Sequence, residues 1–548
     1  MRRFHPLITG TLLLTAVGFF CRILGFFYRI FLSRTIGAEG LGLYQMIFPI
    51  HGIAFALCAG PIQTSLSRLT AASPEKGRAF LRVSLALSLS IALPLTIFIY
   101  LFADFLAAHV LLAPECAPLL PALALSIPFC AIHACCCGYY YGFKKTAVPA
   151  FSQVVEQCIR IFSVLLIVHV CRTNRIPITV LLAVWGLLIG EAASAIFCLL
   201  VYGSSKPVSR RSGTDKSNPN LSRQMEPSSP SSEAAMPRIS AAPLLSPLLA
   251  LTLPLMANRL TLSFLQSLEA IFVPNQLLLS GLSRVESVSI YGVLTGMALP
   301  FILFPSAITN SLAVVLLPAV SEAQAQNQPD KIEHTISMAL RYSLYMGILC
   351  VGLFTRFGPA LGETFYHNAD AGRFIQILSW LCPFLYLSTT MGSILNGLGK
   401  TGTVFLHHTV SMLLTLSLVL FAIPRWGIFA YLAALLISEL VLAFLHIHAL
   451  ACEVPIRLPL GQGIVKPVFC LLTALGILQG LERSNHLLHT LFTFETLPHL
   501  FPSVLFQAGG LCLLYAGGLL LLHKKYKKWH RTDSNAILVL ILTCLLLL

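Results

Sequence analysis

Arginine side chains interrupt long apolar stretches of this chain, and each is a candidate for binding an anion. Arg22 and Arg29 lie seven residues apart, which in a helix places both on one face, about 10 Å from each other. Arg259 stands in a later stretch. A guanidinium binds phosphate through paired hydrogen bonds, so these residues are predicted to hold an anionic group such as a diphosphate. The alternatives are that Arg29 reaches a polar surface and that Arg22 and Arg259 pair with carboxylates.

Acidic residues also occur inside apolar stretches. Glu156 and Arg160 are four residues apart, with the acid on the favourable N-terminal side, which predicts a structural ion pair within one helix. Glu191, Glu269 and Glu439 are lone carboxylates in separate stretches. A carboxylate removed from water holds a proton more readily, so each could exchange H⁺ or bind Na⁺. The alternative for each is a hydrogen-bonded structural acid.

Metal ligands are not clustered along the sequence. The sixteen cysteines contain no Cys-x-x-Cys pair, and we interpret them as small apolar packing residues. The pairs His407-His408 and His446/His448 lack a third convergent ligand in the sequence. His133 is interpreted as a packed, hydrogen-bonded histidine, with a proton relay as the alternative. The sequence therefore predicts no metal site.

Enzyme motifs are also missing from the sequence. Gly399-Lys400-Thr401 imitates the end of a phosphate-binding loop, but Ile394 stands where such a loop needs its first glycine. The chain carries no Asp-x-Asp pair, which argues against a glycosyltransferase. We expect no enzymatic activity and no cofactor.

These residues must be positioned by membrane-spanning helices. Of the 548 residues, 56% are hydrophobic and only 10% are charged, against about 25% charged in soluble domains. Apolar runs long enough to cross a bilayer recur from end to end, and their Leu-rich, non-alternating pattern favours helices over a barrel. The fold class is therefore an all-α polytopic membrane protein with about fourteen transmembrane helices. The spans are expected at 9–33, 41–67, 81–110, 117–142, 149–170, 177–202, 243–279, 287–320, 335–360, 373–397, 402–423, 426–450, 461–480 and 502–523.

One polar stretch, rich in Ser, Pro, Lys and Arg, divides the spans into two blocks. The expected organisation is a six-helix lobe at 1–202, a flexible cytoplasmic linker at 203–242, a second six-helix lobe at 243–450, two extra helices at 451–523, and a basic segment with a short apolar tail at 524–548. The last 13 residues are apolar but short for a span, so we expect them in the membrane interface.

The two blocks resemble each other in sequence. The segment 43–65 matches 290–311, and Tyr141–Thr146 matches Asn396–Thr401, in the same order. Because six is an even number of spans, such halves would form a parallel repeat about an axis along the membrane normal, with a binding site between them. The alternative is chance similarity between apolar sequences.

Basic residues predict the orientation in the membrane. With the N- and C-termini in the cytoplasm, the cytoplasmic segments carry about three times as many Lys and Arg residues as the outer loops. This bias accounts for the formal net charge of +15, which faces anionic membrane lipids, and gives no reason to invoke nucleic acid.

The first 70 residues resemble the stage V sporulation protein B family, within the superfamily of multidrug, oligosaccharidyl-lipid and polysaccharide exporters. The resemblance is carried by Gly10–Ala16, Arg22–Arg29 and Gly37–Gln45. It implies a MATE-like bundle of two lobes around a central cavity, in a bacterial cell membrane. Lipid II flippases often carry an acid just after the Gly-Ala turn, where this chain has Leu43-Tyr44.

The resemblance implies a flippase that moves an anionic lipid-linked oligosaccharide, of the peptidoglycan-precursor type, to the outer leaflet by alternating access. It links this export to spore cortex and cell-wall synthesis, with cell-wall synthesis proteins as possible partners. Relatives bind cations in the seventh span, so Glu269 is the first candidate for coupling to H⁺ or Na⁺, with the membrane potential as another driving force. The alternatives are a cation-coupled multidrug antiporter and a non-transporting membrane scaffold.

Overall fold

A computed structural model describes residues 6–204, 242–454, 461–491 and 500–524, and its long elements are all helices, with no strand in these ranges. The first half contains α1 (Pro6–Met46), α2 (Phe48–Cys58), α3 (Gly60–Ala72), α4 (Gly77–Leu101), α5 (Ala103–Phe105), α6 (Leu120–Gly142), α7 (Ala147–Thr173) and α8 (Leu181–Ser204). The second half contains α9 (Ala242–Leu279), α10 (Arg284–Gly292), α11 (Leu299–Leu303), α12 (Ser306–Ala325), α13 (Pro329–Leu361), α14 (Ala369–Leu378), α15 (Cys382–Gly397), α16 (Thr401–Trp426) and α17 (Ile428–Glu453). Two further helices follow, α18 (Lys466–Leu491) and α19 (Leu500–Lys524).

The all-α membrane architecture predicted from the sequence is confirmed. Thirteen helices of the described part are long and apolar enough to cross a membrane. The first of them, Leu13–Ala72, contains two of the expected spans, and the expected span 287–320 is broken near Pro305 between α11 and α12. The last expected span, 502–523, lies within α19. Because the first two expected spans fall in one of the thirteen helices and 287–320 falls in two, the expected fourteen spans differ from the thirteen only by this last one.

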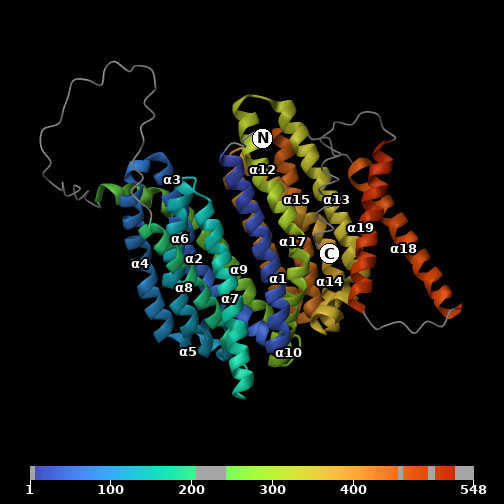
Figure 1. Cartoon of the computed structure of the whole chain (residues 1–548), viewed down its shortest axis with the longest axis horizontal. Helices are drawn as coiled ribbons and strands as arrows, with labels where there is room; N and C mark the ends of the chain where they lie inside the picture. Colours follow the sequence, from blue (N-terminus) through green and yellow to red (C-terminus); the bar gives the residue numbers. More distant parts are fainter. Residues whose placement is uncertain (1–5, 205–241, 455–460, 492–499, 525–548) are drawn as a thin grey trace, which may run out of the picture.

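The helices form two groups with α1 between them (Figure 1). Helices α3, α4, α6 and α8 gather on one side, α12, α13, α15 and α17 on the other, and α18 and α19 lie at the outer margin of the second group. The first helix of each half lies where the groups meet, because α1 packs against both α7 and α10, and α9 packs against both α2 and α16. This arrangement places the side chains of α1 between the two halves.

Helix α1 turns sharply at Gly37, whose φ of 71° lies in the left-handed region that favours glycine. The chain before this turn forms the expected first span, and the chain after it begins the second. Just beyond the turn, α1 lies almost in backbone contact with α10. A Cβ added at Gly42 would stand 2.2 Å from the carbonyl oxygen of Val288, and one added at Gly292 would stand 2.0 Å from that of Ala38. Small residues thus allow the two helices to approach closely.

Two expectations lie outside the described residues. These are the linker, of which 205–241 is not described, and the basic segment with its apolar tail at 525–548. The described helices are compatible with the expected boundaries, since α8 ends at Ser204 and α9 begins at Ala242. The division into lobes and linker stays a prediction.

Candidate functional site

A cavity of about 560 Å³ lies between the two halves, next to α1. Its wall contains Arg22 and Arg29 from α1 and Arg160 from α7. The second half contributes Phe304, between α11 and α12, and Ser306 and Asn310 from the start of α12. Most of the remaining wall is apolar or uncharged polar, including Tyr28, Tyr44, Gln45 and Gln157. The structure therefore brings two of the three candidate substrate-binding arginines into one space.

A second cavity of about 570 Å³ continues the first toward the beginning of α1. The two share Cys21, Arg22 and Asn310, so together they form one chamber with Arg22 at its middle. The second cavity is bordered by Leu14, Gly18, Tyr141, Gln153, Ser311 and Val314 among others. We refer to the two cavities together as the central chamber.

The arginines of the central chamber differ in their partners. Arg22 is exposed, and it makes no hydrogen bond or ion pair to any residue that the structure describes. Arg29 is exposed too, and its Nη1 atom lies 3.5 Å from the carbonyl oxygen of Thr295. Arg160 is nearly buried and ion-paired. Two guanidinium groups are thus available to an anion that enters the chamber.

The two halves contact each other at the far end of the chamber. Arg34, on α1, donates hydrogen bonds to the carbonyl oxygens of Thr364 and Phe365, both at 2.8 Å. Arg284, at the start of α10, donates to the carbonyl oxygen of Leu112 at 2.9 Å and lies 3.3 Å from Oε2 of Glu115. Together with the close approach of α1 and α10, these contacts join the two halves beyond the Arg29 end of the chamber. We call this set of contacts the outer seal, because the orientation predicted from the basic residues would place it at the external face.

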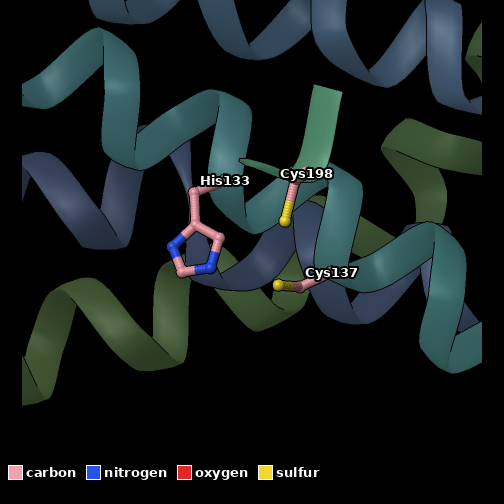
Figure 2. A group of neighbouring side chains, drawn as sticks. All are labelled: His133, Cys137 and Cys198. Atoms are coloured by element: carbon pink, nitrogen blue, oxygen red, sulfur yellow. The ribbon is translucent and has the colours of Figure 1, made fainter. Parts of the chain in front are cut away.

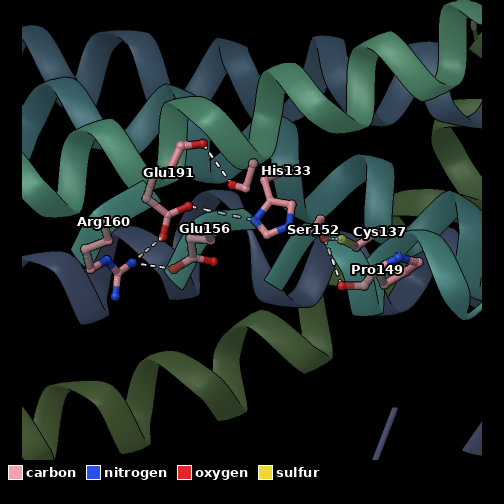
Figure 3. Close-up of polar contacts among 8 residues, drawn as sticks. His133, Cys137, Pro149, Ser152, Glu156, Arg160 and Glu191 are labelled. Carbon is pink, nitrogen blue, oxygen red and sulfur yellow. Dashed lines mark hydrogen bonds and ion pairs between the residues drawn. The ribbon is translucent and has the colours of Figure 1, made fainter. Parts of the chain in front are cut away.

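A buried polar network lies behind the chamber wall, between α6, α7 and α8 (Figure 3). Arg160 contacts Glu156 through the predicted pair and also lies 4.0 Å from Oε1 of Glu191. The other oxygen of Glu191, Oε2, is 3.8 Å from Nδ1 of His133. Nε2 of His133 is 2.9 Å from Oγ of Ser152. The ion pair expected within one helix is therefore part of a network over three helices, which holds Arg160 at the chamber wall.

Arg259 is not among the residues that line the two cavities of the central chamber, and its role in substrate binding stays a prediction. Its side chain is exposed, and its guanidinium lies over the ring of Phe55, 5.7 Å from the ring centroid. The prediction grouped Arg259 with Arg22 and Arg29 because all three interrupt apolar stretches. Spacing within one helix relates Arg22 to Arg29, but it says nothing about a residue on a different helix.

Glu269 lies in a separate cavity of about 450 Å³ inside the second half. It accepts a hydrogen bond of 2.8 Å from the hydroxyl of Tyr431. Glu439 lines the same cavity and accepts a hydrogen bond from Ser388. His408 also borders it, and its ring lies 5.6 Å from that of the buried His446. Two carboxyl groups thus share a polar pocket enclosed by α9, α15, α16 and α17.

Several polar residues of the chamber were not singled out from the sequence. Gln153 and Gln157 on α7 are spaced four residues apart and continue the stripe that ends at Arg160. A stripe of polar side chains along one face of an otherwise apolar helix is a detectable signal in membrane proteins. Asn310 gave a weaker signal, because its polar neighbours on α12 are Ser and Thr residues, which are common in membrane helices.

Two groups of possible metal ligands occur within the described residues. One consists of His133, Cys137 and Cys198 (Figure 2), and the other of His133, Glu156 and Glu191. The sequence predicted no metal site because the two cysteines are far apart in the chain and neither belongs to a short motif. Their proximity arises only from the packing of α8 against α6.

Comparisons with known proteins agree on the fold. The chain is 27% identical over 468 residues to stage V sporulation protein B of Bacillus subtilis (strain 168), covering 83% of this chain and 85% of that protein. It is 24% identical to sporulation protein YkvU of the same organism, covering 76% and 88% of the two chains.

Two solved structures share the fold. One is the lipid II flippase MurJ in an inward closed conformation, with a TM-score of 0.68 and 15% identity over 94% of this chain and 99% of that one. The other is an inward-facing multidrug resistance MATE family transporter, with a TM-score of 0.61 and 14% identity over 79% and 94% of the two chains.

These two structures show the fold of this chain. The family of polysaccharide biosynthesis proteins matches residues 7–324, which is more than half of the chain. These residues contain α1, α7 and most of α12, the helices that enclose the central chamber. The protein is thus a multi-span membrane protein that belongs to the polysaccharide biosynthesis protein family.

Proposed function

We propose that this protein carries an anionic lipid-linked oligosaccharide from the cytoplasmic to the outer leaflet of a bacterial cell membrane by alternating access. The observation that supports it most is the central chamber, in which Arg22 and Arg29 face a shared space between two halves. The fold shared with the lipid II flippase MurJ supports this substrate class, and the match to the polysaccharide biosynthesis protein family supports a sugar-containing substrate.

The chemistry of the chamber suits a diphosphate. Two guanidinium groups on one helix face can each donate paired hydrogen bonds to phosphate oxygens. The surrounding Gln45, Gln157 and Asn310 offer amide groups for sugar hydroxyls. In this proposal the polyprenyl tail stays in lipid, and the head group alone enters the chamber.

The orientation predicted from the basic residues gives the cycle its direction. It places the beginning of α1, toward which the chamber extends, in the cytoplasm, and it places the outer seal at the external face. The substrate would then bind from inside, and opening of the outer seal would release it outside. An inside-negative potential favours outward movement of an anion by about 2.3 kcal/mol per charge per 100 mV.

Glu269 is proposed as the residue that couples transport to a cation. The two carboxyl groups of its cavity, Glu269 and Glu439, could share a proton or a Na⁺ ion. Its position inside the second half separates it from the anion site, so coupling would act through a change in the packing of α9. A Glu269→Gln variant should transport without a response to an imposed H⁺ or Na⁺ gradient, and an unchanged response would remove Glu269 from this role.

The runner-up function is a cation-coupled multidrug antiporter, which the MATE-like fold makes reasonable. The charge of the chamber argues against it, because the guanidinium groups of Arg22 and Arg29, which have no carboxylate partner among the described residues, would repel cationic drugs. A non-transporting scaffold would have no need for a polar chamber between its halves. Involvement in spore cortex or cell-wall synthesis, with cell-wall synthesis proteins as partners, is proposed from the relatives' names alone.

The direct test is translocation of a fluorescent lipid-linked diphosphate sugar in reconstituted vesicles. Arg22→Ala should abolish translocation, and Arg22→Lys should retain part of it because the positive charge remains. Arg172→Ala is the control, because Arg172 is an exposed arginine of α7 that does not line the chamber. Equal loss in both variants, or full translocation in Arg22→Ala, would count against the proposed site.

A further inference from the structure

A cluster of soft ligands lies in the first half, separate from the central chamber. His133 and Cys137 stand four residues apart on α6 and therefore share a helix face, and Cys198 reaches them from α8 (Figure 2). The ligand atoms of the three side chains all lie within 4.8 Å of one another. We propose that His133, Cys137 and Cys198 bind one thiophilic divalent d¹⁰ cation, for which Zn²⁺ is the natural probe.

The geometry is close to that of a bound site. In a tetrahedral zinc centre with bonds of about 2.0 to 2.3 Å, the ligand atoms lie roughly 3.5 Å apart. The ligand atoms would therefore need to approach one another by about 1.3 Å at most, which rotation about the side-chain bonds can supply. Oγ of Ser152, on α7, is 2.9 Å from Nε2 of His133 and 3.7 Å from Sγ of Cys137. The hydroxyl, or a water beside it, is thus placed to complete the coordination.

The surroundings of His133 support a ligand role for its Nε2 atom. A metal-binding histidine typically donates its second ring N–H to a carboxylate, which fixes the tautomer. Here Nδ1 of His133 faces Oε2 of Glu191 at 3.8 Å (Figure 3). That oxygen is buried and lacks a hydrogen-bond partner among the described residues. A cation on Nε2 would hold the proton on Nδ1, where a small shift lets it donate to this oxygen.

The charge of the two thiolates indicates a divalent cation. Cys137 and Cys198 are buried, with exposed fractions of 6% and 0%. Two thiolates with one divalent ion sum to zero, whereas a monovalent ion such as Cu⁺ would leave an uncompensated negative charge in a medium of low dielectric constant. Thiolate sulfur in turn disfavours Mg²⁺ and Ca²⁺, which prefer oxygen ligands.

The bound cation would join α6 to α8, and through Ser152 to α7. These three helices also hold the Glu156–Arg160–Glu191 network, so the ion would fix the wall that carries Arg160. This role is structural and does not depend on which substrate the chamber takes.

The test titrates the full-length protein, purified in detergent with a chelator and a phosphine reductant, with Co²⁺ and then Zn²⁺. We expect one equivalent of Co²⁺ to produce a thiolate charge-transfer band and tetrahedral d–d bands, which Zn²⁺ abolishes. Cys137→Ser and Cys198→Ser should each lose the charge-transfer intensity. Glu191→Gln should weaken Zn²⁺ binding on the order of 10–100-fold. Cys135→Ser is the matched control, because Cys135 is buried on the same helix but points to Ser84.

A second measurement needs no variant and covers the case in which a variant does not fold. Zn²⁺ should slow alkylation of Cys137 and Cys198 in the unmodified protein and leave the exposed Cys158 unaffected. The proposal is overturned if Co²⁺ gives no thiolate band, if Cys137→Ser and Cys198→Ser bind like the control, or if peptide mapping finds these two cysteines joined as a disulfide in protein purified without reductant.

Discussion

Arg34 donates a hydrogen bond of 2.8 Å to the carbonyl oxygen of Phe365, and this contact ties the first helix of the chain to the end of α13. Its second hydrogen bond, to Thr364, involves the same π-helical turn at Gly362–Tyr366. The acceptors are backbone atoms, so substitution of Thr364 or Phe365 would leave them in place. The strength of the outer seal therefore depends on the arginine side of this contact.

Removing that arginine should favour opening at the outer seal. Arg34→Ala loses two charge-assisted hydrogen bonds, and because Arg34 is exposed we expect a change of about 1 kcal/mol, or roughly fivefold in the ratio of open to closed molecules. Labelling of a cysteine introduced near the seal by an impermeant maleimide measures this ratio. Arg172→Ala, at an exposed arginine on α7, is the control, and equal labelling rates in both variants would contradict the prediction.

The close approach of α1 and α10 makes a second prediction. Gly292→Ala places a methyl group 2.0 Å from the carbonyl oxygen of Ala38, so the helices must separate. Overpacking of this kind costs about 1–3 kcal/mol, and it should raise maleimide labelling at the seal as Arg34→Ala does. Gly52→Ala is the matched control, since its added methyl meets no atom within 4 Å. A seal that stays as closed in Gly292→Ala as in the control would show that this contact does not hold it.

The two chamber arginines should act on the same ligand group. If Arg22 and Arg29 hold one diphosphate, a double-mutant cycle of Arg22→Ala and Arg29→Ala should show a coupling energy of about 0.5–3 kcal/mol in substrate binding. Equilibrium binding of a fluorescent lipid-linked diphosphate to detergent-solubilised protein provides the four Kd values. Losses that add within roughly 0.5 kcal/mol would indicate two independent contacts instead.

Removal of the Arg160 guanidinium should destabilise the protein, and further removal of one carboxylate should restore part of that stability. Arg160→Met leaves Glu156 and Glu191 without their shared partner and should destabilise the protein by about 3–5 kcal/mol. Adding Glu156→Gln to that variant removes one of the uncompensated charges and should restore part of the stability. Thermal unfolding in detergent tests both steps, with Arg172→Met as the control on the same helix. A double variant less stable than Arg160→Met would refute this account.

The sequence predicts those features that depend on spacing within a single helix. Apolar runs reveal the spans, and a separation of seven residues places Arg22 and Arg29 on one face of α1, where both border the chamber. The separation of four residues likewise brings Glu156 and Arg160 into contact.

Relations between helices are harder to predict, because they depend on packing that one sequence does not encode in any local pattern. No pattern in the sequence predicts the contact of the Arg259 guanidinium with the ring of Phe55, because the two residues lie on different helices. Cys198 meets His133 and Cys137 only because α8 packs on α6. The break near Pro305 was also missed, because the apolar run continues through it without a change in composition.

The positive charge of the central chamber has a consequence for the leakage of ions across the membrane. A carrier with a water-accessible space of this size could let protons and other cations leak across the membrane each time it changes from the inward-open to the outward-open state. Arg22 and Arg29 stand in the passage, and the described residues that line it include no carboxylate to attract small cations. Fixed positive charge repels H₃O⁺, Na⁺ and K⁺ from a narrow path. The same guanidinium groups that would recruit an anion would therefore also limit the leakage of small cations through the protein.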